Sequence, residues 1–318
     1  MKALLLKACL AMCVAAPAWA ADAIKLTPLQ VTPHVYYFQG DSRMAGADNR
    51  GFMSNAGFVV TADGVVVFDS LGTPALGQGM VDAIRSVTRQ PIRRVIVSHY
   101  HADHFYGLQA LKAAGAEVWA HENGRNYLAS DVAAARLAQR KADLAPWVDE
   151  QTRLIPADRW LHFDAAKAQA FEMGGLHFRV LDMSGAHTPE DLMLWVEEDR
   201  MLFAGDLFFT GRLPFVGEAD SRSWLLALDQ MLKIAPVAVV PGHGAMSRAP
   251  RQDLELTRSY LQFLRRTMGA AVNDMLPFED AYRQTDWSAF SGYPAFEQAN
   301  RINAFQTYLL MERESLQK

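Results

Sequence analysis

The residues best suited to chemistry are four potential metal ligands within six positions, namely His99, His101, Asp103 and His104. They follow an apolar stretch at 92–97 that is typical of a buried strand, and they precede a predicted helix. Imidazole and carboxylate groups are common metal donors in proteins. Because the chain has only 9 histidines, a chance cluster in a solvated loop is improbable. The spacing predicts one ion facing the first two histidines and a second within reach of Asp103 and His104.

Three later residues match the same chemistry. His187, Asp206 and His243 each come shortly after an apolar run and have a glycine nearby. Glycine allows the backbone to pass close to an ion, and side chains at the ends of strands meet at one edge of a sheet. Each residue alone is more typical of a hydrogen-bonded loop, but together with the first cluster they indicate further ligands.

The elements that must position these residues follow from apolar periodicity. Strands are expected at 34–38, 56–61, 65–69, 92–97, 117–120, 176–183, 192–196, 201–204 and 237–240, and helices at 74–88, 106–114 and 223–233. Met80, Ile84 and Val87 are expected on one side of the first helix. Residues 122–160 are interpreted as an insertion over one face, helical at first and then irregular. The alternation predicts an α/β protein with βαβ units in a mixed sheet.

Composition restricts the classes of protein. The chain has 318 residues, of which 50% are hydrophobic and 21% charged, so it can bury a substantial core. Its formal charge of −4 provides no basic surface of the kind that binds nucleic acid. A small-molecule substrate is therefore expected, and a nucleic-acid partner is not.

Residues 1–20 are predicted to be a signal peptide. Lys2 and Lys7 flank or interrupt a short apolar run at 8–16, and Ala18-Trp19-Ala20 fits a signal-peptidase site. The run is shorter than the ~20 residues that a membrane-spanning helix needs. Both cysteines of the chain, at positions 9 and 13, would be removed with it, so any metal must be bound by His, Asp and Glu. We expect export to the periplasm and no membrane span in the mature protein.

The sequence resembles the metallo-β-lactamase superfamily over about residues 30 to 250. The resemblance rests on four motifs in a fixed order: His-x-His-x-Asp-His, a single His, Gly-Asp, and Pro-Gly-His-Gly. The resemblance implies an αββα sandwich with a dinuclear site at the edge between its two sheets. It further implies that the first metal is held by His99, His101 and His187, the second by Asp103, His104 and His243, and that Asp206 bridges both. Asp69 matches the family's strand-end Asp, which supports the histidine loop by hydrogen bonds.

Residue identities separate the branches of this superfamily. Asp206 stands where many carbapenem-hydrolysing members have Cys, so the ligand set is similar to that of glyoxalase II and the lactonases. Residues 98–108, 187–192, 211–215 and 303–309 resemble the exported quinoprotein relay system zinc metallohydrolases and their relatives in sulfur-oxidation gene clusters. Glu190 stands where such proteins more usually have Gly.

The resemblance implies an exported dinuclear zinc hydrolase. A hydroxide shared by two Zn²⁺ ions would attack an ester, thioester, lactone or lactam bond, and Asp103 would orient that hydroxide. Fe²⁺ or Mn²⁺ also suits these donors. The alternatives are a mononuclear iron persulfide dioxygenase of the same superfamily, and a non-catalytic periplasmic metal-binding partner of a redox system. Tyr100 is interpreted either as an oxyanion partner or as a packing residue.

The surroundings of the site carry weaker predictions. Four residues follow Asp206 closely: Phe208, Phe209, Arg212 and Phe215. In one interpretation they line the mouth of the metal site, and Arg212 pairs with a substrate carboxylate. In the other, Arg212 lies on the surface and the aromatic residues belong to the core. Trp147 and Trp160 are lid or core residues, and His34, His121, His162 and His177 are expected to be structural. Residues 21–250 are predicted to form the catalytic domain, and residues 251–318 a helical extension packed on it.

Overall fold

The computed structural model of the protein describes residues 24–317. The predicted signal peptide and both cysteines therefore lie outside the described residues. In the part of the chain that is described, no helix combines the length and the apolar character needed to cross a membrane.

The first sheet contains seven strands in chain order. They are β1 (Leu29–Gln30), β2 (Val35–Phe38), β3 (Ala56–Val60), β4 (Val65–Phe68), β5 (Ile92–Ile96), β6 (Glu117–His121) and β7 (Arg159–Leu161). Strands β1 to β4 pair antiparallel, whereas β4 to β7 pair parallel. Parallel pairing requires crossover connections, and helices supply those that follow β4 and β5.

The second sheet contains five strands in the order β12-β11-β10-β9-β8. They are β8 (Ala168–Met173), β9 (Leu176–Asp182), β10 (Leu192–Val196), β11 (Met201–Phe209) and β12 (Ala238–His243). Only the pair β11 and β12 is parallel. Both sheets are mixed, as the sequence predicted.

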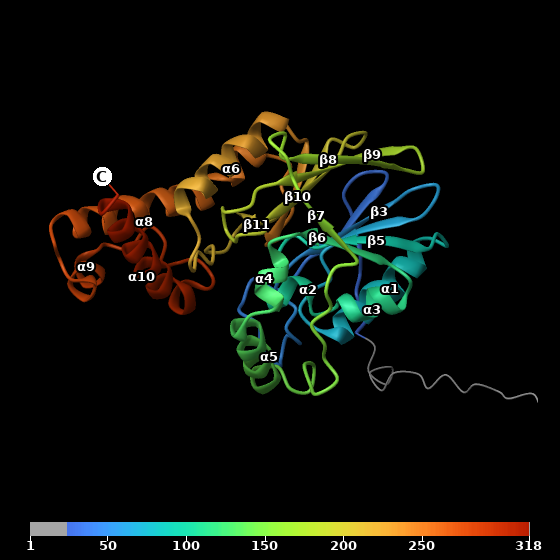
Figure 1. Ribbon diagram of the computed structural model, residues 1–318, viewed down its shortest axis with the longest axis horizontal. Coiled ribbons are helices and arrows are strands. Elements are labelled where there is room, and N and C mark those ends of the chain that lie inside the picture. Colours follow the sequence, from blue (N-terminus) through green and yellow to red (C-terminus); the bar gives the residue numbers. More distant parts are fainter. Residues whose placement is uncertain (1–23, 318) are drawn as a thin grey trace, which may run out of the picture.

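Three apolar cores define four layers (Figure 1). Phe68 of the first sheet stacks on Phe203 of the second at 5.4 Å, in the core between the sheets. The outer face of the first sheet is covered by α1 (Pro74–Val87), α2 (Ala102–Phe105) and α3 (Leu108–Ala113). The outer face of the second is covered in part by α6 (Ser221–Ile234). This arrangement confirms the αββα sandwich.

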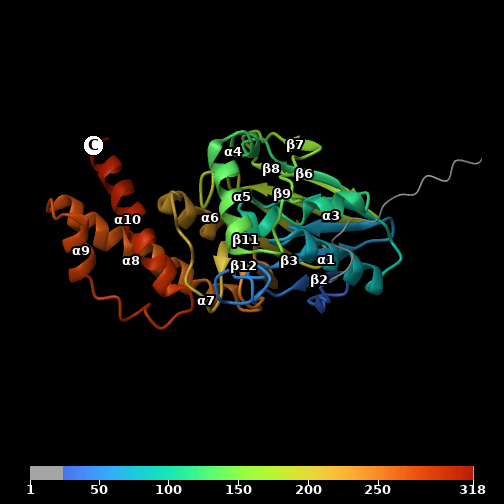
Figure 2. The ribbon, with the colours of Figure 1, turned by 90° about the horizontal axis from the view of Figure 1, so that it is seen from below.

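The remaining helices lie outside the sandwich. They are α4 (Gly124–Leu128), α5 (Asp131–Asp143), α7 (Pro250–Asp253), α8 (Glu255–Asn273), α9 (Phe278–Gln284) and α10 (Phe296–Ser315). Figures 1 and 2 show α8, α9 and α10 grouped at one end of the molecule, beyond α6. Tyr260 and Leu261 of α8 share the apolar core of Trp224 on α6. The predicted helical tail is confirmed, and the division into domains near residue 250 stays a prediction.

Several predicted boundaries were wrong. Strand β11 continues to Phe209, past the predicted end at residue 204. The helix predicted at 106–114 begins only at Leu108, after Gly107, where a Cβ atom would lie 1.9 Å from the Ser70 carbonyl oxygen and no larger residue fits. Val87 is 36% exposed, so the buried side of α1 excludes it. Strand β8 was not predicted because its side chains are mostly half-exposed or exposed and lack a clear alternation.

Candidate metal centre

The seven predicted ligands meet at one edge of the sandwich, where β5, β9, β11 and β12 end or bend. His99 and His101 lie between β5 and α2, and His187 lies between β9 and β10. His243 is the last residue of β12. Asp206 lies within β11 rather than after a strand, because the register shifts around Gly205, whose φ is +52°. This left-handed glycine turns the strand locally and brings Asp206 to the centre.

The ligand atoms form two groups. His99, His101, His187 and Asp206 make one group and Asp103, His104 and His243 the other, each with its ligand atoms within 4.8 Å of one another. Asp206 faces both groups. Its Oδ1 lies 3.1 Å from His104 Nε2 and 3.2 Å from His243 Nε2. Its Oδ2 lies 3.5 Å from His187 Nε2 and 3.9 Å from His99 Nε2.

The chemistry of these atoms fits metal ions. His99 Nε2, His104 Nε2, Asp103 Oδ2 and Asp206 Oδ1 are buried and have no hydrogen-bond partner among the described residues. Leaving a buried polar atom unpaired costs about 1–3 kcal/mol. His187 Nε2 and His101 Nδ1 lie only 3.2 Å apart, as two donors of one ion do. Cations bound between these nitrogen and oxygen donors would satisfy all of them, and zinc, iron and manganese all accept such donors.

Asp69 holds the histidine loop, as the resemblance implied. Its Oδ2 accepts a hydrogen bond from His104 Nδ1 at 2.8 Å and one from the Ser98 hydroxyl at 2.8 Å. Its Oδ1 accepts from the Ser98 backbone N–H at 2.7 Å. The Ser98 hydroxyl in turn lies 2.9 Å from His99 Nδ1, so it can accept the proton of that nitrogen. These acceptors leave Nε2 of His99 and of His104 free to bind a metal.

His243 is positioned from the opposite side. Its Nδ1 donates to the Met53 carbonyl at 2.8 Å, which leaves Nε2 directed at Asp206. Arg212 is 1% exposed, with Nη1 3.0 Å from His243 Nδ1 and Nη2 3.1 Å from Met44 Sδ. Both interpretations of Arg212 from the sequence were therefore wrong. It is neither at the mouth nor on the surface, but buried behind a predicted metal ligand, His243.

Burial sets the charge state of several ligands. It lowers the pKa of His187 to about 3 and also lowers the pKa of His99 and of His101. These rings are therefore neutral, the form that binds a metal. Burial alone would raise the pKa of Asp206, but His243 and His104 hold it well below its usual range. The group of three histidines thus faces an ionised carboxylate.

The centre opens to solvent on the side of His101, which is half-buried, whereas the other six ligands are buried. The ring of Phe215 lies 6.5 Å from that of His101, so Phe215 borders the opening. Phe208 and Phe209 are fully buried in the core, so of the two interpretations that the sequence left open for them, core aromatics is confirmed. Trp147 donates its ring N–H to the Ala47 carbonyl at 3.0 Å.

Tyr100 is a packing residue. It is 1% exposed, and its ring lies 4.8 Å from Phe105 and 6.1 Å from Trp160. Burial raises the pKa of its hydroxyl far above the ordinary value. Of the two roles that the sequence left open, the structure supports packing, with Trp160 as part of the same cluster.

The four histidines expected to be structural lie outside both groups of ligands among the described residues. Each of them lies near a carboxylate elsewhere, His121 at 3.6 Å from Asp182 and His162 at 2.5 Å from Glu122. His34 lies 3.1 Å from Asp199, and His177 lies 2.6 Å from Glu198.

Sequence reasoning missed several supporting residues. Ser98 precedes the histidine motif directly, and its position was the only signal available. Asn55 donates through Nδ2 to the carbonyls of Pro241 and Gly244, at 2.9 and 2.8 Å, and so holds the loop of His243. Glu190 accepts from the Tyr100 backbone N–H at 3.3 Å, which ties the loop of His187 to that of His99. Neither Asn55 nor Glu190 has a local pattern that indicates these distant contacts.

Comparisons with known proteins agree with this geometry. The family model of the metallo-β-lactamase superfamily matches residues 49–243. A metallo-β-lactamase type 2 of Bacillus sp. (strain 170) is 27% identical over 213 residues, covering 65% of this chain and 70% of the relative. The metallo-β-lactamase type 2 of Elizabethkingia meningoseptica is 26% identical over 218 residues, covering 66% and 78%.

Solved structures extend the comparison of the fold. A metallo-β-lactamase from Pontibacter korlensis has a TM-score of 0.57 at 22% identity, covering 75% of this chain and 99% of that one. The sec-alkylsulfatase Pisa1 from Pseudomonas sp. has a TM-score of 0.68 at 16% identity and covers 90% of this chain. This chain spans only 50% of the sulfatase's length. The fold, the paired groups of ligands and the family match together show that the chain belongs to the metallo-β-lactamase superfamily of metal-dependent hydrolases.

Proposed function

We propose that the protein is a dinuclear zinc hydrolase. The observation that carries the proposal is the position of Asp206, whose two carboxylate oxygens face two complete groups of donors. A mononuclear site would leave Asp103, His104 and His243 buried without a cation. Three side chains per ion and a shared carboxylate match a site that keeps positions open for water and substrate.

The residues of the chain define the chemistry. Bound zinc ions would polarise the scissile group and lower the pKa of water from 15.7 to about 7. Asp103, whose Oδ2 lies 3.3 Å from His243 Nε2, places an ionised carboxylate beside the second group, where it can accept a hydrogen bond from the attacking water and so orient it. Asp69, Ser98 and the Met53 carbonyl keep the ligand nitrogens in place, so the site needs little reorganisation during the reaction.

The expected substrates are esters, thioesters, lactones or lactams. The lactamase relatives support the hydrolysis of an acyl bond, and Asp206 in place of Cys supports the glyoxalase II-like branch. We further propose that the protein is exported to the periplasm, on the basis of residues 1–20. The resemblance to the quinoprotein relay system metallohydrolases supports the same location.

The test is metal content per chain together with hydrolysis of a chromogenic cephalosporin, an acyl-homoserine lactone and a glutathione thioester. We expect two zinc ions per chain and turnover of at least one substrate. Asp206→Ala should lower both metal content and turnover, because it removes the carboxylate shared by the groups. Asp63→Ala, an exposed carboxylate in a turn, is the matched control and should change neither.

Two outcomes would contradict the proposal. One iron per chain, no hydrolysis and oxygen consumption with a persulfide would indicate the dioxygenase alternative. Metal binding without turnover of either kind would support a non-catalytic partner of a redox system. Localisation is tested separately, by the N-terminal sequence of protein recovered from the periplasm, which should begin at Ala21.

A further inference from the structure

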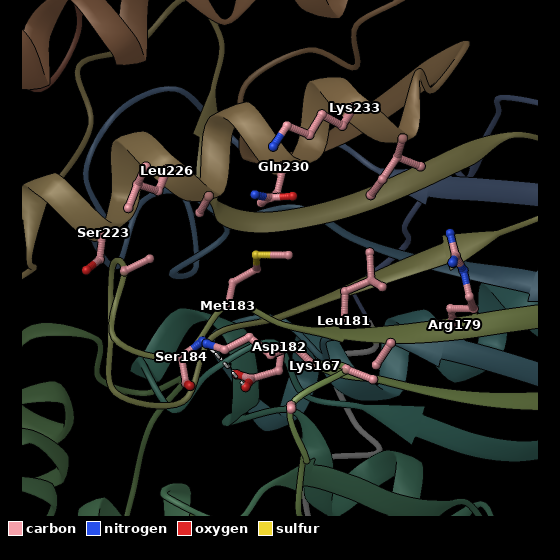
Figure 3. Close-up of a pocket in the computed structure, with 16 residues that line it drawn as sticks. Lys167, Arg179, Leu181, Asp182, Met183, Ser184, Ser223, Leu226, Gln230 and Lys233 are labelled. Atoms are coloured by element: carbon pink, nitrogen blue, oxygen red, sulfur yellow. Dashed lines mark hydrogen bonds and ion pairs between the residues drawn. The ribbon is translucent and has the colours of Figure 1, made fainter.

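A groove with a volume of about 670 Å³ lies on the outer face of the second sheet, between α6 and strands β8 and β9. Figure 3 shows α6 on one side of it and β9 on the other. The groove exists because α6 packs on β11 and leaves the outer face of β8 and β9 uncovered. It is distinct from the metal centre, since it contains none of the seven ligands.

The middle of the groove is apolar. Leu181 of β9 lines it together with Met183 and Ala186 of the loop after β9, and Leu226 and Ala227 line it from α6. In Figure 3 the Met183 side chain extends from the end of β9 toward the helix. Leu226 is 59% exposed, so a large apolar side chain at the rim has no cover in the described structure. An apolar ligand segment would remove this surface from water.

The charges that line the groove are mostly positive. Lys167, Arg179 and Lys233 contribute three cations, against one carboxylate, Asp182. Lys167 lies 3.8 Å from Asp182, and Arg179 lies 3.3 Å from Glu197 just outside the groove. Lys233 has no ion pair among residues 24–317. In Figure 3 the Lys233 ammonium points back along α6 toward Gln230, and Arg179 lies farther along the groove on the side of the strand.

Uncharged polar side chains also line the groove. The Gln230 side chain lies one turn from Lys233 on α6 and lines the groove. Ser184 and Ser223 lie at the opposite end in Figure 3. The groove therefore combines an apolar centre, an excess of cations and polar side chains at both ends.

We propose that this groove binds an amphipathic monoanion, with its carboxylate at Lys233 and Gln230 and its alkyl chain along Met183 and Leu226. The volume lies within the roughly 300–1,000 Å³ of small-molecule sites. The excess of cations selects an anionic headgroup over a neutral or cationic one. The groove also reaches Ala186, the residue before His187, so its occupant lies beside the loop of a metal ligand.

The experiment is calorimetric titration of metal-free full-length protein with dodecanoate below its micellar concentration. Removing the metal prevents binding of the carboxylate at the metal centre. We expect saturable binding of one dodecanoate per chain, at least about tenfold tighter than dodecyltrimethylammonium, because the headgroup charge is reversed. Equal affinity for both amphiphiles would overturn the proposal.

Two variants localise the binding. Lys233→Glu should weaken dodecanoate binding by about tenfold or more, since attraction becomes repulsion. Ala227→Trp should abolish it by filling the groove. Arg89→Glu, the same change of charge at an exposed position outside the groove, should leave affinity unchanged. Circular dichroism confirms that each variant is folded, and wild-type affinity in a folded Lys233→Glu or Ala227→Trp protein would place the dodecanoate elsewhere and contradict the proposal.

Discussion

Single residues decide which nitrogen of His99, His104 and His243 faces the candidate metal centre. Asp69 accepts a hydrogen bond from His104 Nδ1, and its own backbone has a φ of +62°. Asp69→Asn preserves this backbone conformation, because Asn tolerates the left-handed region, but it replaces one acceptor oxygen by a donor. We expect zinc affinity to fall by about 10–100-fold in a chelator competition.

The matched control for this change is Asp63→Asn, in an exposed turn. It should bind zinc as the wild type does. If Asp69→Asn also retained wild-type affinity, the orienting role of Asp69 would be wrong.

Glu190 predicts a pH dependence of stability. Burial raises its pKa to about 6 from an ordinary value of 4.5. The folded state therefore holds a proton that the unfolded state has released between these values, and the free energy of unfolding falls as pH rises through this window. The loss amounts to about 2 kcal/mol for the group.

Glu190→Gln tests this dependence, because its amide oxygen can still accept from the Tyr100 N–H. Urea unfolding should show the variant close to wild type at pH 4 and more stable than wild type at pH 7.5. A difference that is constant across this range would show that Glu190 does not titrate there.

At the scale of elements, the close packing of two helices predicts that an added side chain between them lowers stability. Helices α1 and α3 approach so closely that a Cβ atom on Gly77 would lie 2.3 Å from the Gly107 carbonyl oxygen. Gly77→Ala should therefore lower the free energy of unfolding by about 1–3 kcal/mol, through overpacking. Urea denaturation measures this change.

Gly269 in α8 is the control for an alanine in a helix. Its Cβ would meet only the flexible Met311 side chain, with Sδ at 3.3 Å. Gly269→Ala should leave stability unchanged or raise it by up to about 1 kcal/mol. Equal destabilisation in both variants would show that close packing at Gly77 is not the cause.

At the scale of the whole molecule, the C-terminal helices hold the rim of the metal centre. Asn303 of α10 is fully buried and accepts from the Val216 N–H at 2.8 Å while donating to the Pro214 carbonyl at 2.8 Å. Phe215, between these two residues, borders His101. The helices far along the chain therefore fix a loop at the site.

Asn303→Ala should lower the free energy of unfolding by about 1–3 kcal/mol, because it leaves buried polar groups unpaired. It should also increase hydrogen exchange at Val216, whose N–H loses its acceptor. Asn273→Ala, exposed at the end of α8, is the control and should change neither. Protection of Val216 equal to that of wild type would contradict the role of Asn303.

Most strands and all seven candidate ligands were predictable from local patterns. The apolar run at β5 and the motif that follows it occupy adjacent positions, so the histidine loop had to leave the end of a buried strand. His187 and His243 follow apolar runs in the same way. Such patterns hold because burial of a strand depends on the residues of that strand. Half-exposed β8 has no such pattern and was missed.

The sequence by itself determined the types and order of the candidate ligands and the alternation of strands and helices, because these depend on side-chain chemistry and local periodicity, and the family resemblance of its motifs implied the layered fold. The tertiary structure alone decided that Arg212 lies buried behind His243, that Asp206 enters the centre from within β11, and that Asn303 holds a distant loop. It also decided where the second sheet stays uncovered beside α6. These features depend on which segments pack together across the whole chain, and local periodicity carries no information about that packing.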